Sequence, residues 1–313
     1  MIHYKKKAFF VLLLLSSLFI FLFNQKNNTK EEDLDKKIIV SVSSFALYDI
    51  TRSIAKDSLH VFSILPFGVD PHSYEPTPRT MANIEKSALV IYSGSGLEPW
   101  THNYTFKKKV LDISKFVHLR KLTKEEEHEH HHIGEHESGI DPHYWLSIEN
   151  MKIATNAITK ELKTLKPENE LLYAKRQKHY LKDLDSLAEQ YRHSLRDCKR
   201  QSIVVSHNAY GYLSEEFGFK VISLNGLSPE AQTDAKNIQK IIETIKKQNI
   251  SLLFSESFAN TKTMHTIANE ESLKVDTLDA LGNITADEMK RHLSYKDIMQ
   301  INLHKITKAL ECN

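Results

Sequence analysis

Cysteine is scarce: Cys198 and Cys312 are the only two in 313 residues. Because no CxxC spacing occurs, neither is expected to bind a metal. No cysteine stands near the N-terminus, so we expect no lipid-modified N-terminal cysteine. In an exported chain these two could form a disulfide. Two unpaired thiols are the alternative, since a sequence does not give the distance between them.

A charge excess of one sign is also missing. Lys and Arg number 42 against 40 Asp and Glu, which gives a formal net charge of +2. Because no basic stripe alternates with aromatics, neither nucleic acid nor an anionic membrane surface is an implied partner. The chain also lacks HExxH, GxSxG and Walker motifs, so no motif supplies a catalytic base or nucleophile. We therefore expect no enzyme.

Apolar residues make up 41% and charged residues 26% of the chain, the balance of a soluble globular protein. A chain of this length favours about two domains. Residues 1–26 place three lysines before an apolar run and predict export, as a cleaved signal peptide or a retained membrane anchor. Residues 27–37 form a charged linker. The predicted location is the periplasm, with tethering to the inner membrane left open.

Short β-branched runs alternate with helical segments, a pattern typical of parallel α/β sheets. It predicts an N-terminal lobe over 38–166 and a C-terminal lobe over 198–313. Residues 167–197 between them have apolar side chains at helical spacing and no internal glycine, which predicts one long rigid helix. The expected strands are 38–42, 61–65, 89–93, 110–113 or 117–119, 203–205, 221–224, 252–254 and 275–278.

Histidine, at 17 residues, is the outlier of the composition. His72 and His143 each follow an Asp-Pro pair, while His207 lies in Ser-His-Asn-Ala-Tyr and Asp279 in a glycine-containing turn. Each segment is placed after the predicted carboxyl end of a strand, the edge at which parallel α/β sheets bind ligands. We expect two facing lobes to bring these four residues together.

Three imidazoles and one carboxylate suit Zn²⁺, which accepts nitrogen and oxygen ligands in tetrahedral geometry. Asp279 is the tentative member of the set, because an aspartate before such a turn often binds backbone instead. Glu256, beyond the third strand of the second lobe, and water are the alternatives.

Residues 125–138 are rich in histidine and glutamate and cannot build a core. Such composition is typical of weak, multivalent metal binding, and a solvated loop is the plainer interpretation; the two are compatible. We expect a low-affinity zinc loop whose histidines are His128, His130, His131, His132 and His136.

These motifs resemble the ZnuA/TroA-like metal-receptor family of ABC importers, whose two lobes are joined by one rigid helix. The resemblance is carried by the segments at 70–76, 96–100, 141–145 and 206–210, which occur in the family's order. It implies a monomeric solute-binding receptor that passes Zn²⁺ or Mn²⁺, as transported substrate, to a membrane permease driven by a cytoplasmic ATPase.

The resemblance also assigns His72 and His143 to the first two ligand positions. His207 stands where manganese receptors have glutamate, and imidazole favours Zn²⁺ over the harder Mn²⁺. Asp279 matches the family's aspartate, but Ala280 replaces the proline that follows it. A manganese receptor, a zinc-dependent hydrolase and a surface adhesin of the same fold are the alternatives to a zinc receptor.

Overall fold

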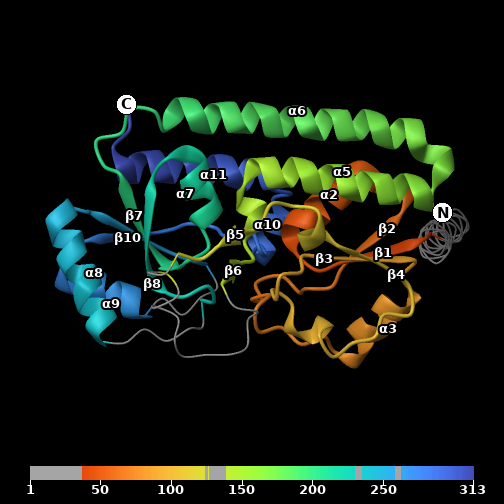
Figure 1. Cartoon of the computed structure of the whole chain (residues 1–313), viewed down its shortest axis with the longest axis horizontal. Coiled ribbons are helices and arrows are strands. Elements are labelled where there is room, and N and C mark those ends of the chain that lie inside the picture. The colour runs from red at the N-terminus through yellow and green to blue at the C-terminus, as the bar shows by residue number, and fades with distance from the viewer. Residues whose placement is uncertain (1–36, 124–125, 127–138, 230–234, 258–261) are drawn as a thin grey trace, which may run out of the picture.

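The computed structural model describes residues 37–123, 126, 139–229, 235–257 and 262–313. The predicted signal segment, most of the predicted linker and the five histidines of the predicted zinc loop lie outside these residues. Two α/β lobes lie side by side beneath a layer of long helices (Figure 1). Within the described ranges, no helix has the length and apolar character needed to cross a membrane.

The N-terminal lobe is built on a parallel sheet with the strand order β2-β1-β3-β4. Its strands are β1 Ile39–Val42, β2 His60–Ser63, β3 Leu89–Tyr92 and β4 Lys109–Asp112. Of the two alternatives for the fourth strand, the first is therefore confirmed, and 117–119 forms none. A separate antiparallel hairpin, β5 Arg120–Lys121 and β6 Ile140–Asp141, lies at the junction of the lobes.

The C-terminal lobe repeats the plan with a parallel sheet in the order β10-β9-β7-β8. Its strands are β7 Ser202–His207, β8 Lys220–Asn225, β9 Leu252–Ser255 and β10 Lys274–Thr277. The predicted class of two parallel-sheet α/β lobes is confirmed.

Helices cover the sheets and begin where the sequence provides caps. Thr77 accepts a hydrogen bond from the Thr80 N–H at 3.2 Å, and Pro78 occupies the first helical turn, as predicted. The α-helices are α2 Phe45–Ala55, α3 Pro78–Lys86, α5 Ile148–Leu165, α6 Glu170–Ser194, α7 Gly211–Phe217, α8 Ala235–Gln248, α9 Lys262–Glu270, α10 Ala286–Lys290 and α11 Tyr295–Leu310.

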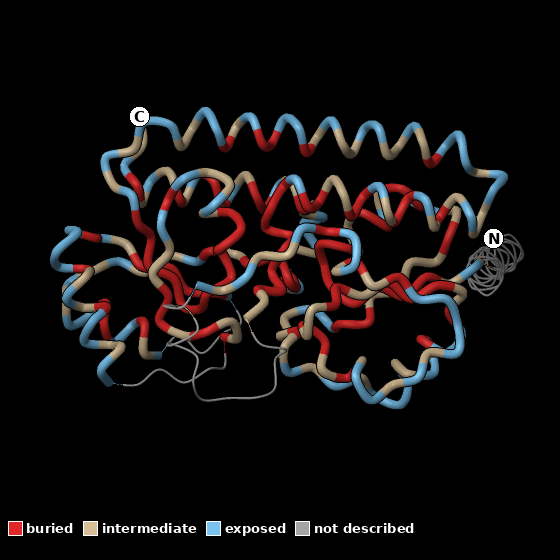
Figure 2. The backbone as a smooth tube through the Cα atoms, in the orientation of Figure 1, coloured by how far each residue is buried: buried red, intermediate tan, exposed pale blue. Residues whose placement is uncertain are grey.

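Helix α6 runs along both lobes and bonds to each of them (Figure 1). Tyr180 donates to Asp49 of α2 at 2.8 Å, and Tyr191 donates to the Met299 carbonyl of α11 at 2.7 Å. The largest apolar cluster continues from strand β1 to helix α11 and so joins the two lobes beneath the long helices, where Figure 2 shows many buried segments. The long helix and this shared core oppose a wide swing of one lobe against the other.

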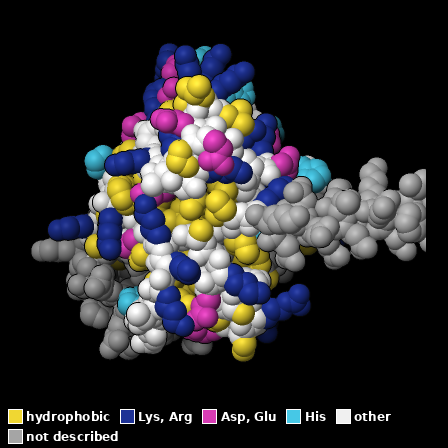
Figure 3. Space-filling model, turned by 90° about the vertical axis from the view of Figure 1, so that its right-hand side faces the viewer, with side chains coloured by type: hydrophobic (Ala, Val, Ile, Leu, Met, Phe, Trp, Pro, Cys, Tyr) yellow, Lys and Arg dark blue, Asp and Glu magenta, His cyan; other side chains and the backbone are white. Residues whose placement is uncertain are grey.

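The end face of the N-terminal lobe is mixed in chemical character. Lys and Arg side chains lie scattered there among acidic and apolar ones rather than in one stripe (Figure 3). This view agrees with the small net charge of the chain, +2.

Candidate metal centre

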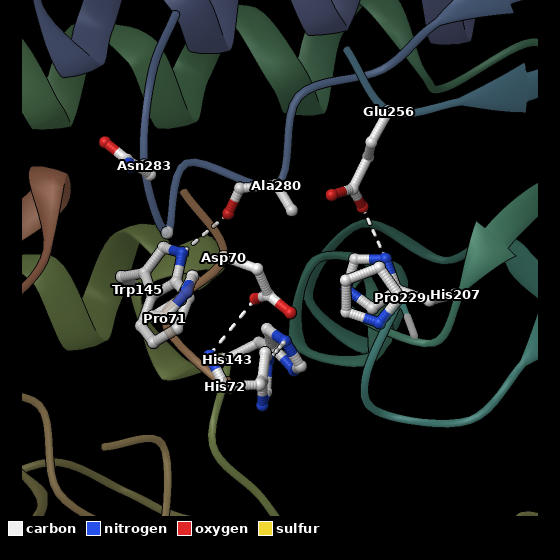
Figure 4. A pocket seen from close by; sticks show the side chains of 11 residues that line it. Asp70, Pro71, His72, His143, Trp145, His207, Pro229, Glu256, Ala280 and Asn283 are labelled. Carbon is white, nitrogen blue, oxygen red and sulfur yellow. Dashed lines mark hydrogen bonds and ion pairs between the residues drawn. The ribbon is translucent and has the colours of Figure 1, made fainter. Parts of the chain in front are cut away.

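Three histidines meet in a small cavity between the two lobes. His72, His143 and His207 line it together with the carboxylates of Asp70 and Glu256 (Figure 4). The cavity has a volume of about 10 Å³, which is room for roughly one water molecule or one ion.

Each Asp-Pro-His segment is held by its own aspartate. Asp70 Oδ1 accepts the backbone N–H of His72 at 3.1 Å, and Asp141 Oδ1 accepts that of His143 at 3.0 Å. The proline has no N–H to donate, so the aspartate carboxylate accepts the N–H of the histidine one residue further on, and this bond closes a turn. The repeated motif therefore builds the same turn twice, and each turn presents an imidazole to the cavity.

Asp141 also fixes the ring of His143. Its Oδ1 lies 2.9 Å from His143 Nδ1, and both side chains are buried. When Asp141 is ionised, its carboxylate only accepts, so Nδ1 then carries the proton and Nε2 keeps a lone pair for a metal. Burial raises the pKa of Asp141 to about 7, while the His143 N–H and Arg120 act to lower it.

His207 has an equivalent partner in Glu256, which pairs with its Nδ1 (Figure 4). The strand order explains the pairing: β7 ends at His207 and its neighbour β9 ends just before Glu256. Burial acts to lower the pKa of His207, but the charge and hydrogen bond of Glu256 outweigh it, so this pKa is raised above 6.5.

One pair of imidazoles is spaced nearly as two nitrogen ligands of a tetrahedral zinc ion would be. His72 Nε2 lies 3.2 Å from His143 Nε2, and zinc–nitrogen bonds of about 2.0–2.1 Å at tetrahedral angles place two nitrogens about 3.3 Å apart. The ring centre of His143 lies 5.1 Å from the ring centre of His72 and 5.4 Å from that of His207. Within the described ranges no group of three His, Cys, Asp or Glu side chains is arranged so that it could hold a metal ion.

Asp279 is not among the residues that line the cavity. Its Oδ1 accepts the backbone N–H of Leu281 at 2.7 Å, which caps the turn after β10. Burial raises the pKa of Asp279 to about 8, and the nearby charge of Glu288 adds to this. Strand β10 is the edge strand beyond β9. The loop that follows β10 contributes Ala280 and Gly282 to the lining of the cavity, but not Asp279.

The predicted placement of His143 after the fourth parallel strand is wrong. It follows β6, which pairs with β5 in the antiparallel hairpin and does not belong to the parallel sheet that contains β4. Sequence reasoning also missed Asp70 and Asp141 as partners of the histidines, although their repeated spacing was a usable signal. Trp145, whose indole donates to the Ala280 carbonyl at 2.7 Å and closes one wall, had no such signal.

Comparison with known proteins identifies the family. The family described as "Zinc-uptake complex component A periplasmic" matches residues 40–309, and this chain belongs to it. The high-affinity zinc uptake system protein ZnuA of Bacillus subtilis is 30% identical over 296 residues, which cover 92% of each chain. The zinc-binding lipoprotein AdcA of Streptococcus pneumoniae is 29% identical, but the match covers 90% of this chain and only 58% of that protein.

Solved structures agree with this assignment. The Zn(II)-bound ZnuA-like domain of AdcA from Streptococcus pneumoniae superimposes with a TM-score of 0.72 at 25% identity, over 88% of this chain and 99% of that one. The laminin-binding protein Lmb of Streptococcus agalactiae, described as having adhesin and metal-transporting activity, gives 0.78 at 26% identity. That match covers 88% of this chain and 100% of the Lmb chain.

Proposed function

We propose that the protein captures Zn²⁺ outside the cytoplasm and delivers it to an ABC permease driven by a cytoplasmic ATPase. The observation that carries the proposal is the convergence of His72, His143 and His207, from both lobes, on one small cavity with room for about one ion. Membership of the zinc-uptake family supports the same conclusion.

In the proposed site the three Nε2 atoms bind zinc, and Asp141 and Glu256 hold the Nδ1 protons of their histidines. An oxygen from Asp70, which lines the cavity, or a water molecule completes the tetrahedron. Asp279 could take this position only if it gave up the Leu281 N–H. Because α6 and the shared core oppose a wide opening, release requires the permease to displace a ligand-bearing loop.

Acid is expected to release the metal. Protons compete with zinc for each imidazole, so between pH 7.5 and pH 5 one histidine of pKa about 6.5 weakens binding about thirtyfold. The raised pKa of His207 means that its proton competes at a higher pH than usual, so the loss begins earlier during acidification. Chelator competition across this range measures the effect, and a constant affinity would contradict the ligand set.

The His207→Glu variant is expected to shift the preference from zinc towards manganese. A carboxylate suits the harder Mn²⁺, so the ratio of zinc to manganese affinity should fall by roughly tenfold or more. His207→Gln serves as the control, because it removes the imidazole without adding an anion. Competition titrations with both metals measure the ratio, and an unchanged ratio in His207→Glu would argue against His207 as a selectivity determinant.

A zinc-dependent hydrolase is the weaker alternative. The cavity that the described residues form has room for about one water molecule or one ion, which suits a metal better than an organic substrate. The carboxylates beside the cavity are also engaged: Asp141 accepts the backbone N–H of His143, and Glu256 pairs with His207 Nδ1. Neither is therefore placed to act as the base of a hydrolase.

Surface adhesion is a second candidate function, favoured by the likeness to Lmb. Transport and adhesion are separated by deleting the gene and supplying excess zinc. Our proposal expects a growth defect in zinc-poor medium that added zinc relieves. Normal growth in zinc-poor medium, together with lost attachment to a host surface, would favour the adhesin.

We further propose that residues 1–26 direct export to the periplasm, and that the histidines of 125–138 gather zinc at low affinity. Removal of residues 127–138 should eliminate the weakly bound zinc ions that a titration detects and leave the tight site intact. Loss of the tight site in that variant would contradict this division of roles.

A further inference from the structure

Arg120, in β5, connects the two lobes beside the metal centre. Its guanidinium contacts three carboxylates: Asp141 Oδ2 at 3.2 Å, Glu126 Oε1 at 2.6 Å and Glu215 Oε1 at 2.5 Å. The Arg120 side chain is only 9% exposed. A buried guanidinium needs such partners, and its planar fork fixes where they lie.

On the side of the N-terminal lobe, Arg120 controls the partner of His143. Asp141 divides its carboxylate between two tasks: Oδ2 faces Arg120, and Oδ1 faces His143 Nδ1 at 2.9 Å. With one oxygen held by the guanidinium, the carboxylate cannot rotate freely about its own bond. Its other oxygen therefore sets the plane of the imidazole.

On the side of the C-terminal lobe, Arg120 fixes the chain that follows His207. Glu215 and Tyr212 lie on α7, which begins four residues after this histidine. The Tyr212 hydroxyl accepts the Arg120 backbone N–H at 2.7 Å and donates to the Asp141 carbonyl at 2.7 Å. Glu126, the third partner of the guanidinium, accepts from Asn208 Nδ2 at 3.0 Å.

Gly211 shows that the contact depends on close approach of α7. A Cβ atom at this position would lie 2.5 Å from Arg120 Nη1 and 2.9 Å from Asp141 Oδ2. Both distances are shorter than van der Waals contact, so a larger residue would displace the Arg120 guanidinium and the Asp141 carboxylate or move α7. Glycine at the start of this helix thus allows Arg120 and Asp141 to meet beneath it.

From these contacts we infer that Arg120 is a positioning residue that sets His143 and His207, one from each lobe, in their relative places before metal arrives. The inference rests on the proposed function as a zinc receptor. Arg120 acts on these histidines through Asp141, Tyr212 and Glu215. Its effect should therefore be seen in affinity and release rate rather than in the number of ions bound.

The test compares the full exported chain with its Arg120→Met variant, which keeps a long side chain and removes the charge and donors. Lys296→Met is the matched control, since Lys296 forms an ion pair with Asp183 at 2.6 Å between α6 and α11. Zinc affinity by chelator competition, zinc dissociation rate, the absorption spectrum of the Co²⁺ form and apo thermal unfolding are measured for each protein.

Arg120→Met is expected to bind zinc about 10–100-fold more weakly, the usual effect of losing an outer partner. It should also release zinc faster and alter the Co²⁺ spectrum, while Lys296→Met stays within about twofold of wild type. Arg120 acts largely through Asp141, so the effects of Arg120→Met and Asp141→Asn should not add. The double variant should bind zinc no more than about twofold more weakly than whichever single variant binds it less tightly.

A folded Arg120→Met protein with wild-type affinity and spectrum would overturn the inference, and so would fully independent effects in the double variant. If Arg120→Met does not fold, Glu215→Gln decides, because that carboxylate is 60% exposed and its loss leaves Asp141 paired. Several-fold weaker zinc binding by Glu215→Gln supports the inference, and unchanged binding overturns it. A wild-type protein without a tight zinc site would instead defeat the proposed function.

Discussion

Zinc affinity is expected to fall about a thousandfold or more when His143 is replaced by alanine. This loss exceeds the 10–100-fold cost of losing an outer partner, because a ligand is removed and Asp141 is left buried without its imidazole. The ring centre of His143 lies 5.1 Å from that of His72 and 5.4 Å from that of His207, so its loss leaves a gap next to both of the other imidazoles. Competition with a chelator of known affinity measures the change.

The His304→Ala variant is the control for this measurement, because His304 is exposed on α11 and is not among the cavity-lining residues. Its zinc affinity should equal that of the wild type. An His143→Ala protein that is folded and binds zinc within tenfold of wild type would refute the proposed ligand set.

The second large effect concerns stability rather than binding. A disulfide joins Cys198 to Cys312 and closes a loop with a sequence separation of 114. Reduction, or replacement of both cysteines by serine, is expected to lower the free energy of unfolding by about 2–5 kcal/mol, since a cross-link over a long loop restricts the unfolded chain strongly. Denaturant unfolding with and without a reductant measures the difference.

The bridge ties the start of β7 to the end of α11, at the opposite end of β7 from His207. Zinc affinity at neutral pH should therefore be nearly the same in the oxidised and reduced proteins. A stability loss below about 1 kcal/mol would show that hydrogen bonds such as Arg200 N–H to the Leu310 carbonyl, 2.9 Å, hold this end without the disulfide.

Much of the fold could be predicted from local sequence. Alternating β-branched runs and helical periodicity indicate parallel α/β lobes because strand and helix leave different spacings of apolar residues. The Thr77-Pro78 pair marked the start of α3, and a run without glycine or proline marked α6. These signals are local, so no knowledge of the tertiary arrangement was needed.

The arrangement of the site depended on information that is not local. The order β10-β9-β7-β8 puts Glu256 beside His207 and moves Asp279 one strand further away, but nothing in the individual strands encodes that order. For the same reason the sequence gives no sign of the hairpin that precedes His143, and the predicted neighbour of this histidine is the fourth parallel strand instead. Arg120 offered no sequence signal at all, because one basic residue in a short strand has no distinctive neighbours.

The central claim is that three imidazoles form one tight zinc site, and calorimetric titration of the chelator-treated exported chain, without residues 1–26, tests it most directly. Zn²⁺ and Mn²⁺ are titrated into the wild type and into a variant with His72, His143 and His207 all replaced by alanine. We predict one tight zinc site in the wild type, weaker manganese binding, and no tight site in the variant. A tight zinc site that survives the triple replacement would contradict the account.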